Sequence, residues 1–327
     1  MNHADIFAPI ERELALVEKK RQACFLESNS RTIKNINGFL LNSTGKRLRP
    51  GLSILSAGAV LGRKSETIHD DLINAAVAIE LLHTASLIHD DVIDSATARH
   101  NRPTINSKFG SHVSIAVGDY VYSISLKLIS LVSNPIVPRC FVQRTFDLCE
   151  GELDQIVERK NFQLSPAQYF SIIKRKTGSL FALSGEVGAL IADSNKSEHI
   201  SAMREFGLNF GMAYQIGDDV RDLVASRIEL GKEPGVDFQT EELTLPMIFL
   251  LNDQRFGAEI KQLLALEDKV SAFEKIRQIA LESSALKKAK GKAQSFLAKA
   301  RKSINPLDSS VYKNQLLALV DWLTETA

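Results

Sequence analysis

Apolar residues recur at spacings of three and four along most of the chain, and this spacing is the strongest constraint on its fold. The pattern is clearest in residues 67–94, 110–132 and 197–226, which are apolar over more than one face. Because an α-helix brings residues three and four positions apart onto one face, these segments are predicted to be buried helices. No segment shows a convincing strand-like alternation. We therefore expect an all-α protein, a helical bundle with its most apolar helices inside.

Glycine and proline usage favours the same fold class. The chain has 18 glycines and 9 prolines in 327 residues. The combined share of these two residue types is lower than the roughly 12% that is average in proteins. Residues 167–233 and 247–305 contain no proline at all. A turn-rich all-β fold is therefore disfavoured. We see no linker that divides the chain, and we expect a single all-α domain over residues 1–327.

Charge and cysteine content narrow the class of protein. The 40 basic and 39 acidic residues nearly balance, so there is no basic excess for a nucleic acid partner. The three cysteines form no Cys-x-x-Cys pair, and the first residues lack the layout of a signal peptide. The longest apolar stretches are too short or carry ionisable residues, as Leu72 to Ile88 carries Glu80 and His83. We expect a cytoplasmic protein with no membrane span.

Two aspartate clusters share the spacing Asp-Asp-x-x-Asp. Each follows an apolar segment that is predicted to be a helix, so its first and last aspartates stack on one face and the middle one flanks them. Three like charges repel, and the negative end of the helix dipole is unfavourable for them. Mg²⁺ suits such hard oxygen ligands together with phosphate oxygens. Two facing clusters would grip a diphosphate. The clusters are Asp90, Asp91 and Asp94, and Asp218, Asp219 and Asp222.

A pair of solvated helix ends is the simpler interpretation of these clusters. The chain offers its own comparison at Asp70 and Asp71, which begin a predicted helix and have Asn74 in place of a third carboxylate. We expect these two residues only to interact favourably with the positive end of the helix dipole. Two complete copies, each behind an apolar helix and each followed by basic residues, favour the metal site.

At these residues the chain resembles the trans-isoprenyl diphosphate synthases, the polyprenyl synthetase family, of the medium- or long-chain type. The resemblance covers nearly the whole chain. It implies an isoprenoid-synthase-type helical bundle around a deep central cavity, with the aspartate helices opposed at its mouth, and a homodimer. The matching motifs are Gly45 to Pro50, Leu81 to Asp91, Arg99 with Arg102 to Thr104, Gly118 to Tyr120, Lys176 with Thr177, Tyr214 to Asp222, Gly231 with Lys232, and Thr244 to Pro246.

The resemblance also implies a metal site that binds an allylic diphosphate. Three Mg²⁺ ions would have Asp90, Asp94 and Asp218 as direct ligands, with the other three aspartates close by or acting through water. The ions would bridge the diphosphate and stabilise the negative charge that forms when it leaves its carbon. The basic residues that resemble the family's diphosphate ligands are Arg99, Lys176 and Lys232.

The second substrate implied by the resemblance is isopentenyl diphosphate. It would lie on Lys46, Arg49 and His83, with Arg47 nearby. Thr177 and Gln215 would offer neutral oxygens to the cationic carbon, and the departing diphosphate would accept the proton. Taken alone, Thr177 and Gln215 would be ordinary capping or core hydrogen bonders, and His83 a core histidine.

Product length would be set below the first cluster. Ala85 and Ser86 lie five and four residues before Asp90, where the family places bulky aromatic residues when it stops at fifteen carbons. Small side chains there imply a product of at least twenty carbons, with thirty to forty carbons within its range.

Three departures from the family pattern change the charge near the diphosphate sites. His100 follows Arg99 where the family has a second arginine, and its charge would depend on pH. Glu241 and Glu242 replace a Gly-Lys pair, and Arg221 lies inside the second cluster, from which it could pair with Glu242 or reach phosphate. We expect these changes to weaken binding of isopentenyl diphosphate more than binding of metal.

The activity implied is a Mg²⁺-dependent prenyltransferase that condenses isopentenyl diphosphate head-to-tail with an allylic diphosphate into an all-trans polyprenyl diphosphate. Two alternatives stay open. The first is an isoprenyl-synthase-like terpene synthase that acts on an allylic diphosphate alone. The second is a non-catalytic subunit of a heteromeric prenyl synthase, although such a subunit would be expected to lose aspartates and all six are present.

Overall fold

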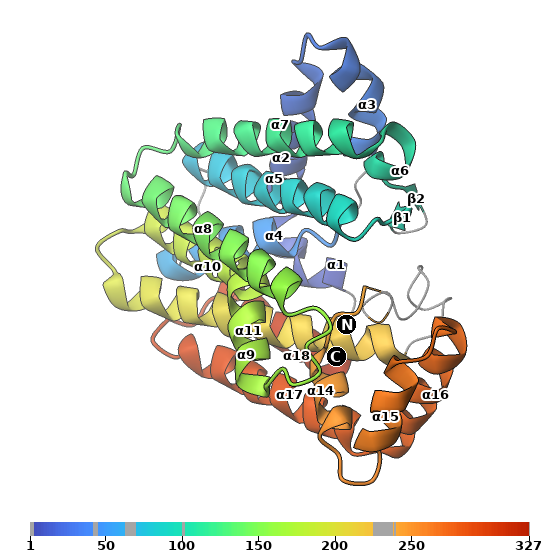
Figure 1. Cartoon of the computed structure of the whole chain (residues 1–327). Coiled ribbons are helices and arrows are strands. Elements are labelled where there is room, and N and C mark those ends of the chain that lie inside the picture. The colour runs from blue at the N-terminus through green and yellow to red at the C-terminus, as the bar shows by residue number, and fades with distance from the viewer. Residues whose placement is uncertain are drawn as a thin grey trace.

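The described part of the chain is almost entirely helical, as expected (Figure 1). This computed structural model describes residues 3–41, 45–62, 70–99, 102–224, 238 and 240–326. The strand content of these residues is one antiparallel pair of two-residue strands, β1 (Ala98–Arg99) and β2 (Arg102–Pro103). Sequence reasoning did not predict this pair, because two residues are too few for alternation to be visible.

The N-terminal helices form the upper and central part of the view in Figure 1. The helix α4 is buried along nearly its whole length, which places the residues that precede it against the inside of the bundle. The elements are α1 (His3–Ile6), the short 3₁₀ helix η1 (Ala8–Ile10), α2 (Glu11–Leu26), α3 (Arg31–Leu41) and α4 (Leu48–Leu61).

The next helices include α5 (Asp70–Ile93), a long helix that is buried over most of its length and runs beside α7 (Ser111–Ile129) (Figure 1). A Cβ on Gly118 of α7 would lie 2.1 Å from Nε2 of His89 on α5. A larger residue at this position would have to displace the ring of His89, which lies next to the first aspartate cluster. The short helix α6 (Ile105–Phe109) precedes α7.

The middle of the chain supplies the opposite side of the bundle. A capping box begins α9, because the side chains of Ser165 and Gln168 each accept from the other's backbone N–H. The elements are α8 (Ile136–Val157), α9 (Pro166–Ile173), the π-helix η2 (Lys174–Gly178), α10 (Ser179–Ala192) and α11 (Ser197–Val224).

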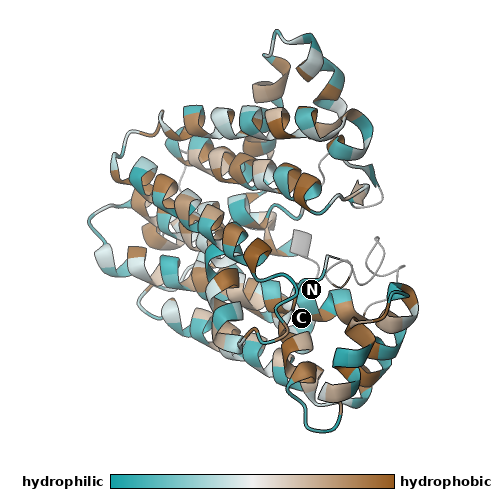
Figure 2. Cartoon of the chain, in the orientation of Figure 1, coloured by the Kyte–Doolittle hydropathy of each residue, from teal (hydrophilic) through white to brown (hydrophobic). Residues whose placement is uncertain are grey.

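The C-terminal helices cover the outer side of α11. Figure 2 shows that they mix apolar and polar turns, as helices with one buried face do. Buried apolar side chains from Ile6 to Leu323 form one continuous core cluster. The elements are α14 (Leu245–Leu251), α15 (Gly257–Leu264), α16 (Lys269–Glu282), α17 (Ala285–Ser303) and α18 (Val311–Thr326).

Helix α5 is the one helix among the described residues that is long and apolar enough to cross a bilayer by length and composition. Most of its apolar window, 72%, is buried inside the bundle. Such burial is the behaviour of a core helix.

Candidate active site

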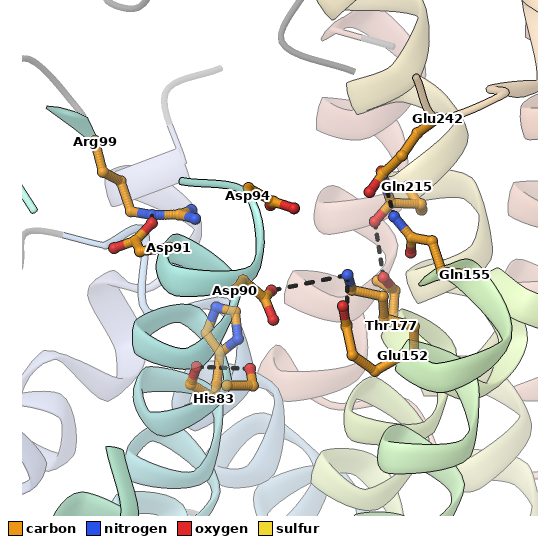
Figure 3. A network of polar contacts seen from close by, with 12 residues as sticks. His83, Asp90, Asp91, Asp94, Arg99, Glu152, Gln155, Thr177, Gln215 and Glu242 are labelled. Atoms are coloured by element: carbon orange, nitrogen blue, oxygen red, sulfur yellow. Dashed lines mark hydrogen bonds and ion pairs between the residues drawn. The ribbon is translucent and has the colours of Figure 1, made fainter. Parts of the chain in front are cut away.

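The two aspartate clusters stand at the C-terminal ends of α5 and α11. In Figure 3, Asp90 and Asp94 point from α5 toward the elements that carry Thr177 and Gln215, whereas Asp91 turns to the other side and meets Arg99. The prediction that the first and last aspartates share a face while the middle one flanks them is therefore confirmed for the first cluster.

Asp90 lies in a small network of buried charges. The ammonium Nζ of Lys176 is 3.8 Å from Oδ2 of Asp90 and 2.5 Å from Oε2 of Glu152. Burial raises the pKa of Asp90 to about 7; Lys176 opposes this rise and Glu152 adds to it. Burial lowers the pKa of Lys176, but the two carboxylates together raise it above its ordinary value. One cation thus serves two carboxylates, and a further cation would be favoured there.

The backbone at Lys176 and Thr177 is a π-helix, a rare form that is frequent at functional sites. It packs against α8 at Gly151, where a Cβ would be only 2.5 Å from the backbone nitrogen of Lys176. Because of this close packing, the side chain of Glu152 lies beside Lys176. On the other side, the hydroxyl of Thr177 donates to Oε1 of Gln215 over 2.7 Å. The structure thus brings together the two residues that were predicted to offer neutral oxygens.

The second cluster divides into inner and outer carboxylates. Asp219 is buried and accepts from the hydroxyl of Tyr169 and from Nε2 of Gln215, the latter over 2.8 Å. Burial raises the pKa of Asp219 to about 7 against these two hydrogen bonds. Asp222 is also buried, whereas the side chain of Asp218 is 44% exposed. Asp218 is therefore the member of this cluster most accessible to a ligand.

Glu242 is paired differently from the expectation. Nη2 of Arg159 donates to Oε1 of Glu242 over 2.8 Å and also to Asp94, and Gln155 donates to Glu242 as well. The interpretation that Arg221 pairs with Glu242 is wrong, because Arg221 donates to Asp218, three residues earlier on α11. Arg159, at the end of α8, compensates the acidic departure instead.

Sequence reasoning missed four residues of this site, namely Glu152, Gln155, Arg159 and Tyr169. One signal could have found the first two. Glu152 directly follows Gly151, and Gln155 lies three residues later, so in a helix they share a face that a neighbouring segment can approach closely. Nothing in the local sequence indicates Arg159 or Tyr169, because their contacts depend on how α8 and α9 pack.

The basic residues at the start of α4 differ in what they contact. Arg47, whose φ of 52° lies in the left-handed region, pairs with Glu80 at 2.8 Å and Glu18 at 3.1 Å. Arg49 lies 4.5 Å from the centroid of the Phe181 ring, and its Nε is buried without a hydrogen-bond partner in the described part of the chain. Lys46 was also predicted to bind isopentenyl diphosphate. Its Nζ lies over the rings of Tyr214 and Trp322.

His83 stands on α5 two turns before Asp90. Burial and the nearby guanidinium groups of Arg49, Arg99 and Arg47 hold its pKa well below the ordinary value of a histidine. The ring is therefore neutral near pH 7, and it can offer a hydrogen bond but no charge to a bound anion.

We predict that His83 makes the folded state sensitive to acid. In the unfolded chain its pKa returns to about 6.5, so below that pH the unfolded state binds a proton that the folded state does not, and the free energy of unfolding falls as pH falls. Denaturant unfolding at pH 7.5 and 5.5 checks this, because the loss should be smaller in His83→Asn than in the wild type. An equal loss in both proteins would contradict it.

The other predicted residues are placed as follows. Arg99 donates from Nε to Oδ1 of Asp91 over 2.9 Å and keeps 38% of its side chain exposed. Ala85 is buried, and Ser86, half-buried, donates to the carbonyl of His83. The predicted ligands His100 and Lys232 lie outside the described residues.

The donor set fits a hard divalent cation. The described residues contain no ready-made group of three side chains close enough to hold a metal, and the carboxylates are held by basic side chains instead. The donors on the shared face, Asp90 and Asp94 with Asp218 on α11, are all carboxylate oxygens. Burial raises the pKa of Asp90, and a divalent cation bound beside this carboxylate would favour its charged form.

Comparison with known proteins gives matches over most of the chain. The family model described as polyprenyl synthetase matches residues 30–280. The chain is 31% identical over 284 residues to heptaprenyl diphosphate synthase component 2 of Bacillus subtilis, covering 87% of this chain and 80% of that one. It is 30% identical over 296 residues to octaprenyl diphosphate synthase of Haemophilus influenzae, covering 90% and 88%.

A solved structure shows the same fold over the whole chain. It is a polyprenyl synthase of Caulobacter crescentus complexed with calcium and isoprenyl diphosphate. The match has a TM-score of 0.91 at 26% identity and covers 100% of this chain and 98% of that one.

Proposed function

The chain belongs to the polyprenyl synthetase family, and on that basis we propose that it is a trans-polyprenyl diphosphate synthase. It joins isopentenyl diphosphate head-to-tail to an allylic diphosphate, and its product is an all-trans polyprenyl diphosphate of at least twenty carbons. One observation carries the proposal. The side chains of Asp90 and Asp94 lie on the same face of α5, where Asp90 pairs with Lys176, and this face is opposite Thr177 and Gln215 (Figure 3).

We propose Mg²⁺ as the cofactor, three ions per active site, held by Asp90, Asp94 and Asp218. When bound, the ions supply positive charge to the diphosphate that leaves. Two observations support this proposal, namely the carboxylate-only donor set and the calcium bound with isoprenyl diphosphate in the Caulobacter crescentus enzyme.

The chain's own residues prepare the departure of the diphosphate. The ammonium of Lys176, already between Asp90 and Glu152, is placed to donate to an oxygen of the leaving group. Gln215 is held at both ends of its amide, accepting from Thr177 and donating to Asp219. Its carbonyl is thereby fixed in orientation, and it can stabilise positive charge on the allylic carbon without capturing it.

The second diphosphate is proposed to bind at the start of α4. Arg49 offers a buried Nε without a hydrogen-bond partner in the described part of the chain, and neutral His83 offers a ring nitrogen. Lys46, over two aromatic rings, supplies a second cation. Arg47 is engaged by Glu18 and Glu80, so we assign it the role of positioning its neighbours.

Product analysis tests the proposed function. Purified protein is incubated with Mg²⁺, labelled isopentenyl diphosphate and, separately, allylic starters of five, ten, fifteen and twenty carbons, and product lengths are measured by mass. Labelled polyprenyl diphosphates of twenty or more carbons are expected. Hydrocarbon or alcohol formed from an allylic diphosphate alone would instead identify a terpene synthase. Turnover only after a second chain is added would identify a subunit, and one curated relative is itself named a component.

We predict that Ser86→Phe shortens the product. Ser86 is half-buried and lies one helical turn before Asp90 on the same face of α5, so a phenyl ring there would block the path of the growing chain. The mass of the longest product should fall by at least one isoprene unit. The same substitution at Ser123, an exposed serine of α7, is the matched control, and an unchanged product from Ser86→Phe would contradict the placement.

We propose that the protein is a homodimer, joined through an apolar face of α7 and α8. Ile115 and Leu126 of α7 are exposed, and four apolar residues of α8 are more exposed still. The two helices are in contact. Surfaces of this kind are typical of subunit interfaces. The α8 residues are Val142, Phe146, Leu153 and Val157.

We predict that Phe146→Glu converts the dimer into a monomer. The side chain is 57% exposed at the centre of this face, and a charge buried there in the dimer would have no partner. Sedimentation measures the mass of the particle. Leu281→Glu, at an equally exposed leucine of α16, is the control and should remain dimeric. A dimeric Phe146→Glu protein would contradict the proposed interface.

We also propose a single domain over residues 1–327 and a cytoplasmic location. The continuous core from Ile6 to Leu323 supports the first. The second is supported by three free cysteines, Cys24, Cys140 and Cys149, as in proteins of a reducing compartment.

A further inference from the structure

Arg221 joins the second aspartate cluster to the C-terminal end of the described chain. Its Nη2 donates to Oδ1 of Asp218, and its Nη1 donates to the backbone carbonyl of Thr326 over 2.8 Å. One planar guanidinium therefore bridges α11 and the last turn of α18. Because its donors form a rigid fork, it cannot turn away from one partner and keep its geometry with the other.

The last turn of α18 also contacts a residue that we assign to the second substrate. Trp322 lies one helical turn before Thr326, and its ring is 5.3 Å from Nζ of Lys46. The same ammonium is 5.7 Å from the ring of Tyr214, one turn before Asp218. Burial lowers the pKa of Lys46, while Asp218 raises it and Arg221 lowers it. Lys46 thus lies within the electrostatic influence of the Asp218–Arg221 pair.

We propose that Arg221 is a positioning residue that couples occupation of Asp218 to the end of α18. In the structure the guanidinium is the counter-ion of Asp218. Resting on the proposed function, the inference is that a divalent cation which binds Asp218 displaces Arg221, and that Arg221 then releases the carbonyl of Thr326.

The consequence concerns the order in which the two diphosphates bind. Release of the last turn of α18 moves Trp322 relative to Lys46, so loading of the metal-bound diphosphate changes the site that receives isopentenyl diphosphate. Coupling of this kind is reciprocal in binding free energy. The arginine inside the second cluster, a departure from the family pattern, is therefore a coupling element rather than a loss of function.

The test compares Arg221→Met with a matched control, Arg277→Met, in the full chain. Arg277 also donates to a backbone carbonyl at the end of α11, that of Val224 over 3.1 Å. Its ion-pair partner is Glu274 rather than one of the six aspartates. Calorimetry measures the affinity for Mg²⁺ in the presence of inorganic pyrophosphate. Hydrogen exchange of residues 323–326 and the fluorescence of Trp322, the single tryptophan of the chain, report on α18.

In the wild type, Mg²⁺ with pyrophosphate should speed exchange of residues 323–326 and shift the emission of Trp322. Arg221→Met should show fast exchange before any ligand is added, no further change on binding, and an affinity for Mg²⁺ about two- to fivefold tighter, the range expected when one exposed ion pair no longer competes. Arg277→Met should behave as the wild type.

Two results would overturn the inference while leaving the proposed function intact. One is an active wild type whose exchange at α18 does not respond to Mg²⁺ with pyrophosphate. The other is an Arg221→Met protein that binds Mg²⁺ no more tightly than the wild type, since that would mean that Arg221 does not compete for Asp218. A wild type that binds neither Mg²⁺ nor pyrophosphate would overturn the inference and the proposed function together.

Discussion

Replacing Asp90 with asparagine is expected to lower kcat by about 10³-fold, the scale seen when one preorganised group is removed from a charged transition state. Asparagine keeps the size of the side chain and removes its charge, so the fold is preserved while a proposed metal ligand is lost. Asp90 also has a raised pKa because it is buried, and the neutral variant should fold at least as stably as the wild type.

Steady-state rates with saturating Mg²⁺ and both diphosphates measure this effect. Asp70→Asn is the matched control, because Asp70 begins the same helix and is exposed. We expect the control to retain wild-type kcat. An Asp90→Asn enzyme within about threefold of the wild type would contradict the role of the first cluster, since a functional ligand is worth far more than that.

Replacing Lys176 with methionine is expected to lower kcat by about 10²- to 10³-fold. Methionine fills a similar volume but cannot donate to the departing diphosphate. It also leaves Asp90 and Glu152 without their shared cation, and we expect a loss of about 1–3 kcal/mol in the free energy of unfolding from that cause.

The neighbouring residue supplies the control for Lys176. Arg175 lies in the same π-helix but pairs outward with Asp154 at 2.6 Å and Glu150 at 3.6 Å. Arg175→Met should lose little kcat. The rates are compared per mole of folded protein, measured by circular dichroism, so that a loss of stability is not counted as a loss of catalysis. Equal effects of the two substitutions would contradict a role for Lys176 in the reaction.

The sequence predicted the helical architecture because helical periodicity is a local property. Residues three and four apart share a face whatever the rest of the chain does, and the capping box at Ser165 is likewise made of residues three apart. The π-helix at Lys176 was not predicted. It packs against α8 at Gly151, and such a contact between distant segments leaves no periodic trace in the sequence.

The candidate site was likewise predicted only in part, in those features that the local sequence determines. The carboxylates were found from their spacing. Thr177 and Gln215 were found from the resemblance, and the hydrogen bond between them is seen only in the structure. The charges that balance the carboxylates were not found. Arg159 reaches both Asp94 and Glu242 from the end of another helix, so its role depends on the packing of α8 against two other elements.

The acidic departure at Glu242 is explained by this pairing. A glutamate in place of a lysine would repel a bound diphosphate if it stood alone. Because Arg159 and Gln155 both donate to it, the glutamate is satisfied within the wall of the site. Its carboxylate thus has a cationic partner, which it shares with Asp94, before any substrate arrives.

The most direct test of the account is a crystal structure of the protein with Mg²⁺ and an allylic diphosphate analogue that cannot ionise. The account predicts ions bound to Asp90 and Asp94 on one side and to Asp218 on the other, with the diphosphate between the two helices and Lys176 donating to it. A diphosphate bound elsewhere, or ions absent from both clusters at saturating concentration, would contradict it.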